Sequence, residues 1–147
     1  MKRLALLLLV LAAACTSTAP TADDAPVRAA MSGFLEALNA LDAEQMATYF
    51  ADDITAFFPV SVAERVNGKA AVTEVFRTYA AETKKTVART NIVAEDLQVM
   101  RSGNVAVVTF FVHNPAAVSR RTFVWRREGT RWLIVHLHAS NYRTASP

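Results

Sequence analysis

Residues 124–140 read V-W-R-R-E-G-T-R-W-L-I-V-H-L-H-A-S, which places a glycine between two segments rich in β-branched and aromatic side chains. Residues 119–127 and 131–140 have the composition of β-strands, and Glu128-Gly129-Thr130 has that of a turn. The pattern predicts an antiparallel hairpin at the C-terminal end of the chain.

The same strand composition extends toward the N-terminus. Residues 87–100 and 105–113 are β-rich, and turn-like residues follow them at 101–104 and 114–115. Four consecutive strands separated by short turns predict an antiparallel meander.

The preceding part of the chain has the apolar periodicity of helices. A first helix is predicted to begin near Asp24 and Pro26 and to bury one face. Its apolar residues, spaced three and four residues apart, are Val27, Met31, Phe34, Leu35, Leu38 and Leu41.

Three shorter elements follow this helix. Residues 42–45 resemble a helix cap and open a short second helix. That helix is predicted to carry Met46, Tyr49 and Phe50. Residues 54–58 are typical of a strand that Pro59 ends.

A third helix is predicted up to about Lys84, because Val72, Val75, Phe76 and Tyr79 share one helical face. Helices first and strands last are the α+β pattern, in which helices pack on one face of a sheet. The sequence therefore predicts one α+β domain.

The first fourteen residues have the composition of an export signal. Lys2 and Arg3 precede an aliphatic run at 4–11, which is shorter than the roughly 20 residues of a spanning helix. We predict a signal peptide over residues 1–14, a lipidated cysteine and flexible tether over 15–25, and a single domain over 26–147.

The segment L-A-A-A-C at 11–15 ends at the only cysteine and resembles a bacterial lipobox, although Ala12 stands where lipoboxes usually have leucine. The resemblance implies that Cys15 is lipidated. Thr16 after the cysteine resembles lipoproteins sent to the outer membrane, where this protein would face the periplasm. Cleavage after Ala14 by the ordinary signal peptidase would instead give a soluble periplasmic or secreted protein.

The charge balance argues against a nucleic-acid binder. The chain has 16 Lys and Arg against 13 Asp and Glu. Without Lys2 and Arg3, the remaining basic residues exceed the acidic ones by one. Phosphate binding would need a clustered basic face, so we predict no nucleic-acid partner.

The order of the predicted elements resembles the nuclear-transport-factor-2-like, or SnoaL-like, superfamily over residues 27–143. F-L-E-A-L-N-A-L-D at 34–42, Y-F-A-D-D-I-T-A-F-F-P at 49–59 and N-G-K-A-A-V-T-E-V-F at 67–76 resemble bacterial ketosteroid isomerase. Residues 124–140 resemble the association domain of calcium/calmodulin-dependent kinase II. The resemblance implies a cone-shaped α+β fold with N-terminal helices packed on a curved antiparallel sheet. It does not imply one chemistry, because this fold serves isomerases, hydrolases, cyclases, assembly hubs and binders.

Phenylalanine occupies the positions that carry chemistry in these relatives. The resemblance to ketosteroid isomerase puts the catalytic base at Phe58, the oxyanion-binding tyrosine at Phe34 and the second acid at Phe123. Phenylalanine can neither carry a proton nor donate a strong hydrogen bond to an oxyanion. We therefore predict no catalytic residue and no cofactor.

The kinase association domain has a glutamate and anion-binding arginines in its pocket. The glutamate position again falls on Phe58, and the arginine positions fall on Phe123 and Ala139 and, less directly, on Phe111. The resemblance thus implies an apolar cone without anion-binding charge.

Strand alternation groups further residues on two strand faces, and the resemblance implies that these faces look into the cone. Thr109, Phe111 and His113 share one face of their strand, and Val135, Leu137 and Ala139 share one face of the last strand. The predicted lining of a site for a small apolar ligand is Phe34, Leu38, Phe58, Thr109, Phe111, His113, Phe123, Leu137 and Ala139. The four phenylalanines either shape this cavity or fill the cone as ordinary core, and both interpretations stay open.

His136 and His138 form an H-x-H pair that could hold a metal with His113 as a third ligand. The same alternation puts the pair on the outer face, beside Trp132 and Ile134 and away from His113. We predict a structural role there, no metal site, and a homodimer formed through this face of the sheet.

The remaining polar candidates are predicted to be structural. Asp52 and Asp53 suit a turn or cap, Glu64-Arg65 an exposed loop pair, and Tyr79 a packed helix. The arginines around the hairpin are expected to be solvated or to contact anionic lipid headgroups. They are Arg120, Arg121, Arg126, Arg127 and Arg131.

These observations predict an exported, lipid-anchored SnoaL-like domain that binds a small apolar ligand without catalysis. Two alternatives stay open. One is an isomerase, hydratase or hydrolase that acts on an apolar substrate through His113, Tyr79 or Glu64. The other is a dimerising interaction module with a filled cone.

Overall fold

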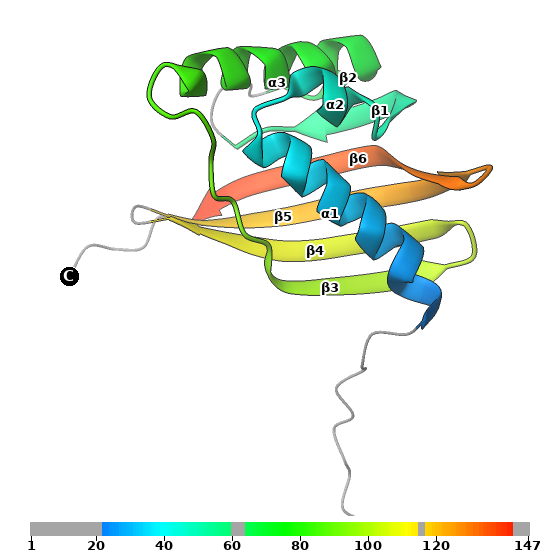
Figure 1. Cartoon of the computed structure of the whole chain (residues 1–147). Coiled ribbons are helices and arrows are strands. Elements are labelled where there is room, and N and C mark those ends of the chain that lie inside the picture. The colour runs from blue at the N-terminus through cyan, green and yellow to red at the C-terminus, as the bar shows by residue number, and fades with distance from the viewer. Residues whose placement is uncertain (1–21, 60–63, 115–116, 143–147) are drawn as a thin grey trace, which may run out of the picture.

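The hairpin around Gly129 lies at the centre of a six-stranded sheet in the computed structural model, which describes residues 22–59, 64–114 and 117–142 (Figure 1). The helical elements are η1 (Ala22–Asp24), α1 (Ala25–Asn39), α2 (Ala43–Ala47) and α3 (Lys69–Lys84). The strands are β1 (Phe50–Phe57), β2 (Val66–Asn67), β3 (Glu95–Ser102), β4 (Val105–Asn114), β5 (Ala117–Glu128) and β6 (Arg131–Tyr142).

The strands follow the order β2-β1-β6-β5-β4-β3. The meander from β3 to β6 is antiparallel, as predicted, whereas β1 runs parallel to β6. Glu128 pairs with Arg131 across the hairpin turn, where Gly129 has a φ of 59°. This left-handed conformation favours glycine, which has no Cβ to clash with the backbone.

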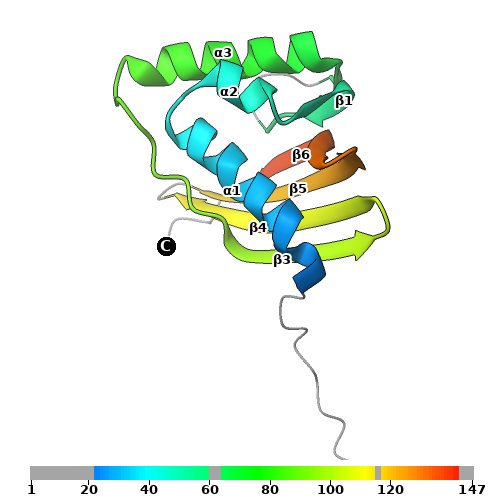
Figure 2. The same ribbon diagram turned by 45° about the vertical axis from the view of Figure 1, so that its right-hand side comes forward.

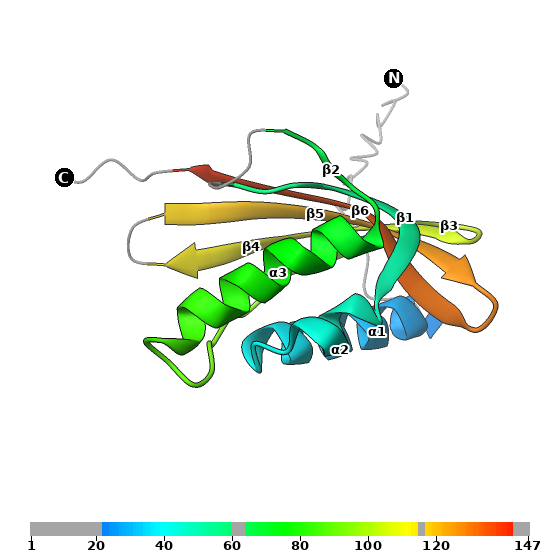
Figure 3. The ribbon, with the colours of Figure 1, turned by 90° about the horizontal axis from the view of Figure 1, so that it is seen from above.

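All three α-helices lie on the same side of the sheet (Figure 3). Helix α1 crosses the meander, and α3 lies beyond it on the side of β1 (Figures 1 and 2). This arrangement confirms the α+β fold that the order of elements predicts. None of the helices in the described part of the chain is long and apolar enough to cross a membrane.

The core lies between the helices and the covered face of the sheet. Phe34 of α1 is fully buried at its centre and packs edge-on against Phe123 of β5, with ring centroids 5.5 Å apart. Removing such a side chain from water contributes about 1.5–3 kcal/mol. The other large side chains that are fully buried include Met31, Met46, Phe50, Ile54, Trp125 and Ile134.

The second helix is shorter than predicted. It ends at Ala47, and the Thr48 hydroxyl donates to the Gln45 carbonyl at 2.8 Å. Two residues after the end of the helix, the Tyr49 carbonyl accepts a hydrogen bond of 2.7 Å from the Ile134 backbone N–H. Because this bond ties the chain to β6, Tyr49 lies outside the helix and Phe50 begins a strand.

The strand predicted over residues 87–100 begins only at Glu95. The side chain of Asn39, the last residue of α1, bonds to the backbone N–H and carbonyl of Ile92. The backbone N–H of Thr90 donates to the Asn39 carbonyl at 3.0 Å. These bonds use backbone groups that a strand would direct to its neighbour, so residues 85–94 form a connection instead.

Strand β6 contains a bulge that changes which residues face the helices. Trp125 pairs with Ile134 and Val124 pairs with His136, so Val135 is an extra residue on β6. Before the bulge, Trp132 and Ile134 are buried on the covered face, and beyond it the buried residues are Leu137 and Ala139. The prediction that Trp132 and Ile134 lie on the outer face is wrong, because strict alternation does not hold across a bulge.

Candidate functional site

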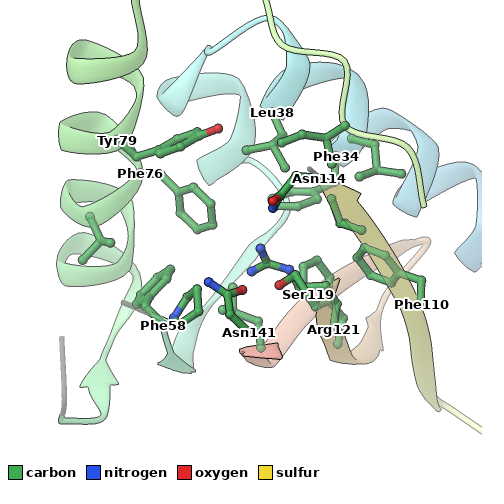
Figure 4. Close-up of a pocket in the computed structure, with 17 residues that line it drawn as sticks. Phe34, Leu38, Phe58, Phe76, Tyr79, Phe110, Asn114, Ser119, Arg121 and Asn141 are labelled. Atoms are coloured by element: carbon green, nitrogen blue, oxygen red, sulfur yellow. The ribbon is translucent and has the colours of Figure 1, made fainter. Parts of the chain in front are cut away.

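A cavity of about 290 Å³ lies between α1, α3 and the covered face of the sheet (Figure 4). Its lining is mainly aromatic and aliphatic. The seventeen lining residues are Phe34, Leu35, Leu38, Phe58, Pro59, Val75, Phe76, Tyr79, Ile92, Phe110, Val112, Asn114, Ser119, Arg121, Phe123, Leu137 and Asn141. Ligand sites in proteins are typically of this apolar character, with a few polar groups that orient the ligand.

Helices α1 and α3 form one wall of the cavity. Phe34 and Leu38 are four residues apart on α1, and Phe76 and Tyr79 are three apart on α3, so each pair shares one helical face. Ile92, held by Asn39, adds to this wall from the connection between α3 and β3.

The sheet forms the opposite wall through alternate residues of three strands. Phe110, Val112 and Asn114 come from β4. Ser119, Arg121 and Phe123 come from β5, and Leu137 and Asn141 come from β6. Successive strand residues point to opposite faces, so one face of each strand supplies the lining.

The aromatic rings make edge-on contacts around the cavity without filling it. Phe76 lies 5.6 Å from Phe58 and 6.0 Å from Phe34, measured between ring centroids. Phe123 contacts Phe110 at 5.3 Å. Such T-shaped contacts stabilise the cluster while the space between the rings stays open.

Polar groups gather at one end of the cavity. Figure 4 shows the guanidinium of Arg121 beside Asn141 and Ser119, with the Tyr79 hydroxyl across the space from it. Burial lowers the pKa of Arg121, and the Tyr79 side chain opposes this shift. Among the described lining residues, Arg121 is the single charged group, and Arg121 and Tyr79 are the titratable ones.

Five of the nine predicted lining residues border the cavity: Phe34, Leu38, Phe58, Phe123 and Leu137. Ala139 is buried on the same side of the sheet but lies outside the lining. The predicted lipidation site, Cys15, and the predicted signal peptide lie outside the described residues.

The other three predicted lining residues, Thr109, Phe111 and His113, lie on the uncovered face of the sheet. They alternate with Phe110 and Val112, which face the cavity. The predicted inward face of β4 was thus one residue out of register, which moves every side chain to the other face. His113 pairs there with Glu95, its Nδ1 lying 3.1 Å from the carboxylate.

Sequence reasoning missed most of the sheet wall, although one signal was present. The even-numbered residues 106, 108, 110 and 112 of β4 are all apolar, whereas the odd-numbered ones include Thr109 and His113. Uniform apolarity is the better indicator of the covered face. No such signal points to Arg121, which the sequence groups with the solvated arginines of the hairpin.

His136 and His138 lie on the uncovered face, as predicted. The Nδ1 atom of His136 is 2.7 Å from the Thr55 hydroxyl, and Phe57 packs against both imidazoles. Burial, followed by the nearby charges of His138 and Arg65, lowers the pKa of His136. Within the described residues, no group of three or more His, Cys, Asp or Glu side chains is arranged to hold a metal ion.

Most of the remaining candidates have structural partners on the surface. Arg126 binds Asp53 at 2.8 and 3.0 Å and thereby lowers the pKa of that carboxyl group. Arg127 donates to the Asn104 side chain, and Arg131 donates to the Thr48 carbonyl. Glu64 and Arg65 are exposed and do not line the cavity.

The model of the SnoaL-like domain family matches residues 27–144. An α+β domain with helices on one face of a six-stranded sheet and a cavity between them is the architecture expected from the sequence resemblance. The chain belongs to the SnoaL-like domain family.

Solved structures of the nuclear-transport-factor-2-like (NTF2-like) fold are similar over most of the chain. An NTF2-like protein of unknown function from Pseudomonas putida KT2440 is 21% identical, with a TM-score of 0.74, covering 87% of this chain and 99% of its own. A protein of the same fold from Streptomyces avermitilis, provisionally described as a dehydratase, is 20% identical, with a TM-score of 0.71 and coverage of 83% and 97%.

The CamKII hub homology domain of Chlamydomonas reinhardtii is 23% identical, with a TM-score of 0.64, covering 83% of this chain and 100% of the domain. At these identities the similarity establishes the fold, which carries many functions. No protein with a curated description matches the chain.

Proposed function

We propose that this protein binds a small, largely apolar ligand in the cavity between its helices and its sheet, without transforming it. The observation that carries this proposal is the cavity itself, with a volume of about 290 Å³ and a lining of mainly aromatic and aliphatic side chains. Burial of apolar ligand surface against such a lining is the main source of affinity in sites of this kind.

The packing of the aromatic rings favours an open site over a filled cone. Phe34 and Phe123 are buried in the core, yet both also border the cavity. Phe111, which could have closed the space from β4, lies on the opposite face of the sheet and is 36% exposed. Phe110 takes its place in the lining, so five phenylalanine rings border the cavity, and a space of about 290 Å³ remains between them.

The lining favours binding over catalysis. Proton transfer in a dehydration or isomerisation requires a positioned acid or base, most often His, Asp or Glu. The described residues that line the cavity include none of these three types, and Phe58 occupies the position of the predicted base. His113, a base considered for an enzyme, lies on the far side of the sheet, paired with Glu95.

The cellular localisation of the protein is also part of the proposal, and it is argued from the sequence. The charged and apolar segments of residues 1–14, followed by Cys15, support export and lipid attachment, with the domain in the periplasm. Metabolic labelling with a radioactive fatty acid tests this, because a Cys15→Ala variant should lose both the label and the membrane association. Label retained by that variant would exclude attachment at Cys15.

A homodimer formed through the uncovered face of the sheet is also part of the proposal. Exposed large apolar side chains on this face support it, because covering them in a dimer would remove their apolar surface from water. They are Phe57, Met100, Val105, Phe111 and Tyr142. Native mass spectrometry at several protein concentrations tests this, and a monomer throughout would exclude the dimer.

The same native mass spectrum tests ligand binding. The protein purified from the envelope of its expression host should carry an added mass that is released on gentle activation. A Leu38→Trp variant, in which the larger ring enters the cavity, should lose this mass. Thr109→Trp is the matched control, because Thr109 lies on the opposite face of the sheet. Wild-type protein that is always free of added mass, or equal loss in both variants, would contradict the proposal.

A further inference from the structure

Arg121 is placed differently from the other arginines of the hairpin. It lies in the middle of β5, where it pairs with Phe110 of β4 and Ala139 of β6. Its side chain is on the covered face together with Ser119 and Phe123, and its guanidinium points into the cavity (Figure 4). The fold thus brings a cation into an otherwise apolar space.

This cation has no carboxylate partner among the described residues, and its one electrostatic contact there is with Tyr79. Arg77, Arg89 and Arg126 each form an ion pair with a carboxylate. Arg121 forms neither a hydrogen bond nor an ion pair within the described chain, and no Asp or Glu is among the described lining residues. A guanidinium stays protonated at neutral pH, so the positive charge is held there uncompensated.

Arg121 is half-buried, so its charge is partly withdrawn from water, and a ligand of opposite charge offsets the cost of this withdrawal. The planar guanidinium presents two parallel N–H groups that match the two oxygens of a carboxylate. The side-chain amide of Asn141 and the hydroxyl of Ser119 lie beside it (Figure 4). The Ser119 hydroxyl donates to the Ser140 carbonyl at 3.4 Å, so this end of the cavity offers the N–H groups of Arg121 and Asn141 to one anionic group.

The rest of the cavity requires an apolar body on the same molecule. Phe58 and Phe76 lie on the side of α3 and the end of β1, and Phe34 and Leu38 lie on α1 (Figure 4). A cavity of about 290 Å³ is at the small end of the range of ligand sites, so this body must be small. The charge is at one end and the aromatic wall occupies the remainder.

Arg121 is also not an arginine that the sequence resemblance predicts. That resemblance places the anion-binding arginines of the kinase association domain at Phe123 and Ala139, which are apolar here. Arg121 lies two residues before Phe123 on the same face of β5. The position of the cation therefore differs from the arginine positions that the resemblance places at Phe123 and Ala139.

We propose that the ligand is a small amphipathic monocarboxylate, whose carboxylate pairs with Arg121 and whose apolar part lies against the aromatic wall. This inference rests on the proposed ligand-binding function and specifies the class of the ligand. Medium-chain fatty acids and arylalkanoic acids both have this chemistry.

Isothermal titration calorimetry with matched acids and amides tests the inference. The probes are octanoate with octanamide, and 3-phenylpropionate with 3-phenylpropanamide, each pair differing mainly in charge. The full-length protein, with its ligand removed, should bind at least one acid about 10- to 100-fold more tightly than its amide, as expected for a charge-assisted hydrogen bond. An Arg121→Met variant should lose this preference while it still binds the amide.

Two further variants control for folding and for general charge. Arg121→Lys keeps the charge but not the paired donors, so it should retain part of the preference. Arg120→Met removes the neighbouring arginine, which is exposed and lies over the Tyr142 ring, and should behave as wild type. Arg121→Met should also unfold at a higher denaturant concentration, because a half-buried charge without a carboxylate partner is replaced by an apolar side chain.

The outcomes separate this inference from the proposed function. Equal affinity for acid and amide in the wild type, or a preference that survives in Arg121→Met, overturns the carboxylate and leaves a neutral apolar ligand. Absence of binding for all four probes, together with a mass spectrum free of ligand, overturns the binding function itself. A preference lost equally in Arg120→Met overturns the assignment to Arg121.

Discussion

The side-chain amide of Asn39 brackets the backbone of Ile92. Its Oδ1 atom accepts from the Ile92 N–H at 2.6 Å, and its Nδ2 atom donates to the Ile92 carbonyl at 3.0 Å. Oδ1 also accepts from the Thr90 hydroxyl at 3.0 Å. One side chain at the end of α1 thus fixes the connection that leads into β3 and places Ile92 in the cavity wall.

Replacing Asn39 with alanine should lower the free energy of unfolding by about 2 kcal/mol, because the partly buried N–H and carbonyl of Ile92 lose their partners. Urea denaturation measures this loss. Hydrogen exchange should also accelerate at the Ile92 amide, since its acceptor is removed.

The Asn39→Asp variant is the matched control. It keeps the acceptor for Ile92 and Thr90 but cannot donate to the Ile92 carbonyl. Its loss of stability should be smaller than that of the alanine variant, and the Ile92 amide should stay protected. Equal losses of stability and of amide protection in the two variants would show that the hydrogen bonds of Asn39 do not hold this connection.

Gly33 lets the ring of Tyr49 approach α1 closely. A Cβ atom at this position would lie 2.1 Å from the Tyr49 hydroxyl oxygen and 2.9 Å from the ring carbon that bears it. Alanine favours the helix by about 1 kcal/mol over glycine, but overpacking costs about 1–3 kcal/mol. Gly33→Ala should therefore lower the free energy of unfolding, by about 1 kcal/mol.

The sign of this effect should reverse when the ring is absent. In a Tyr49→Leu background, Gly33→Ala should stabilise the protein, by up to about 1 kcal/mol, because only the helix propensity remains. The four proteins form a double-mutant cycle whose coupling is measured by urea denaturation. A zero coupling energy would mean that the two residues do not exclude each other.

Asp42 caps the short helix α2, as its sequence predicts. Its carboxylate accepts from the Gln45 backbone N–H at 2.9 Å. Asp42→Ala should lower the free energy of unfolding by about 1 kcal/mol, whereas Asp42→Asn keeps an acceptor and should lose much less. Chemical denaturation of the two variants decides this, and losses of equal size would point to the charge instead of the cap.

The fold was predictable because its signals are local and repeated. The helical spacing of Val27, Met31 and Phe34 and the glycine of the β5–β6 hairpin each specify one element. The order of those elements then specifies the α+β class. Where tertiary hydrogen bonds compete with local preference, as at Tyr49 with Ile134 and at Asn39 with Ile92, the predicted boundaries were displaced.

The cavity was only partly predictable, for two physical reasons. Spacing put Phe34 and Leu38 on the buried face of the first helix, and the family resemblance put Phe34 in the cone, where both residues border the cavity. Strand faces depend on register, and an error of one residue on β4 exchanged Phe110 for Phe111. The bulge at Val135 reverses which face of the sheet the odd- and even-numbered residues of β6 occupy. Nothing in the sequence around Val135 marks it as an inserted residue.

Arg121 shows a different limit of the sequence. Arginine on a strand is most often solvated, and five arginines near one hairpin reinforce that expectation. The surroundings of these arginines become distinct only in the folded structure. Arg126 meets Asp53, whereas Arg121 enters the cavity.

The lowered pKa of His136 predicts a dependence of stability on pH. Burial is the main cause, followed by the charges of His138 and Arg65. The unfolded chain therefore takes up a proton near pH 6.5, a higher pH than the folded protein does. The free energy of unfolding should accordingly be highest above this pH and fall as the pH is lowered from 8 toward 5.

A His136→Gln variant isolates this contribution, because glutamine can still bond to the Thr55 hydroxyl but does not titrate. Urea midpoints measured between pH 8 and pH 5 should fall less steeply for the variant than for the wild type. The pKa values of Asp53 and Glu36 are held below 3.8 and 4.5 by their arginine partners, so these carboxylates lose their contribution only at lower pH. Parallel curves for the two proteins would therefore assign the change above pH 5 to groups other than His136.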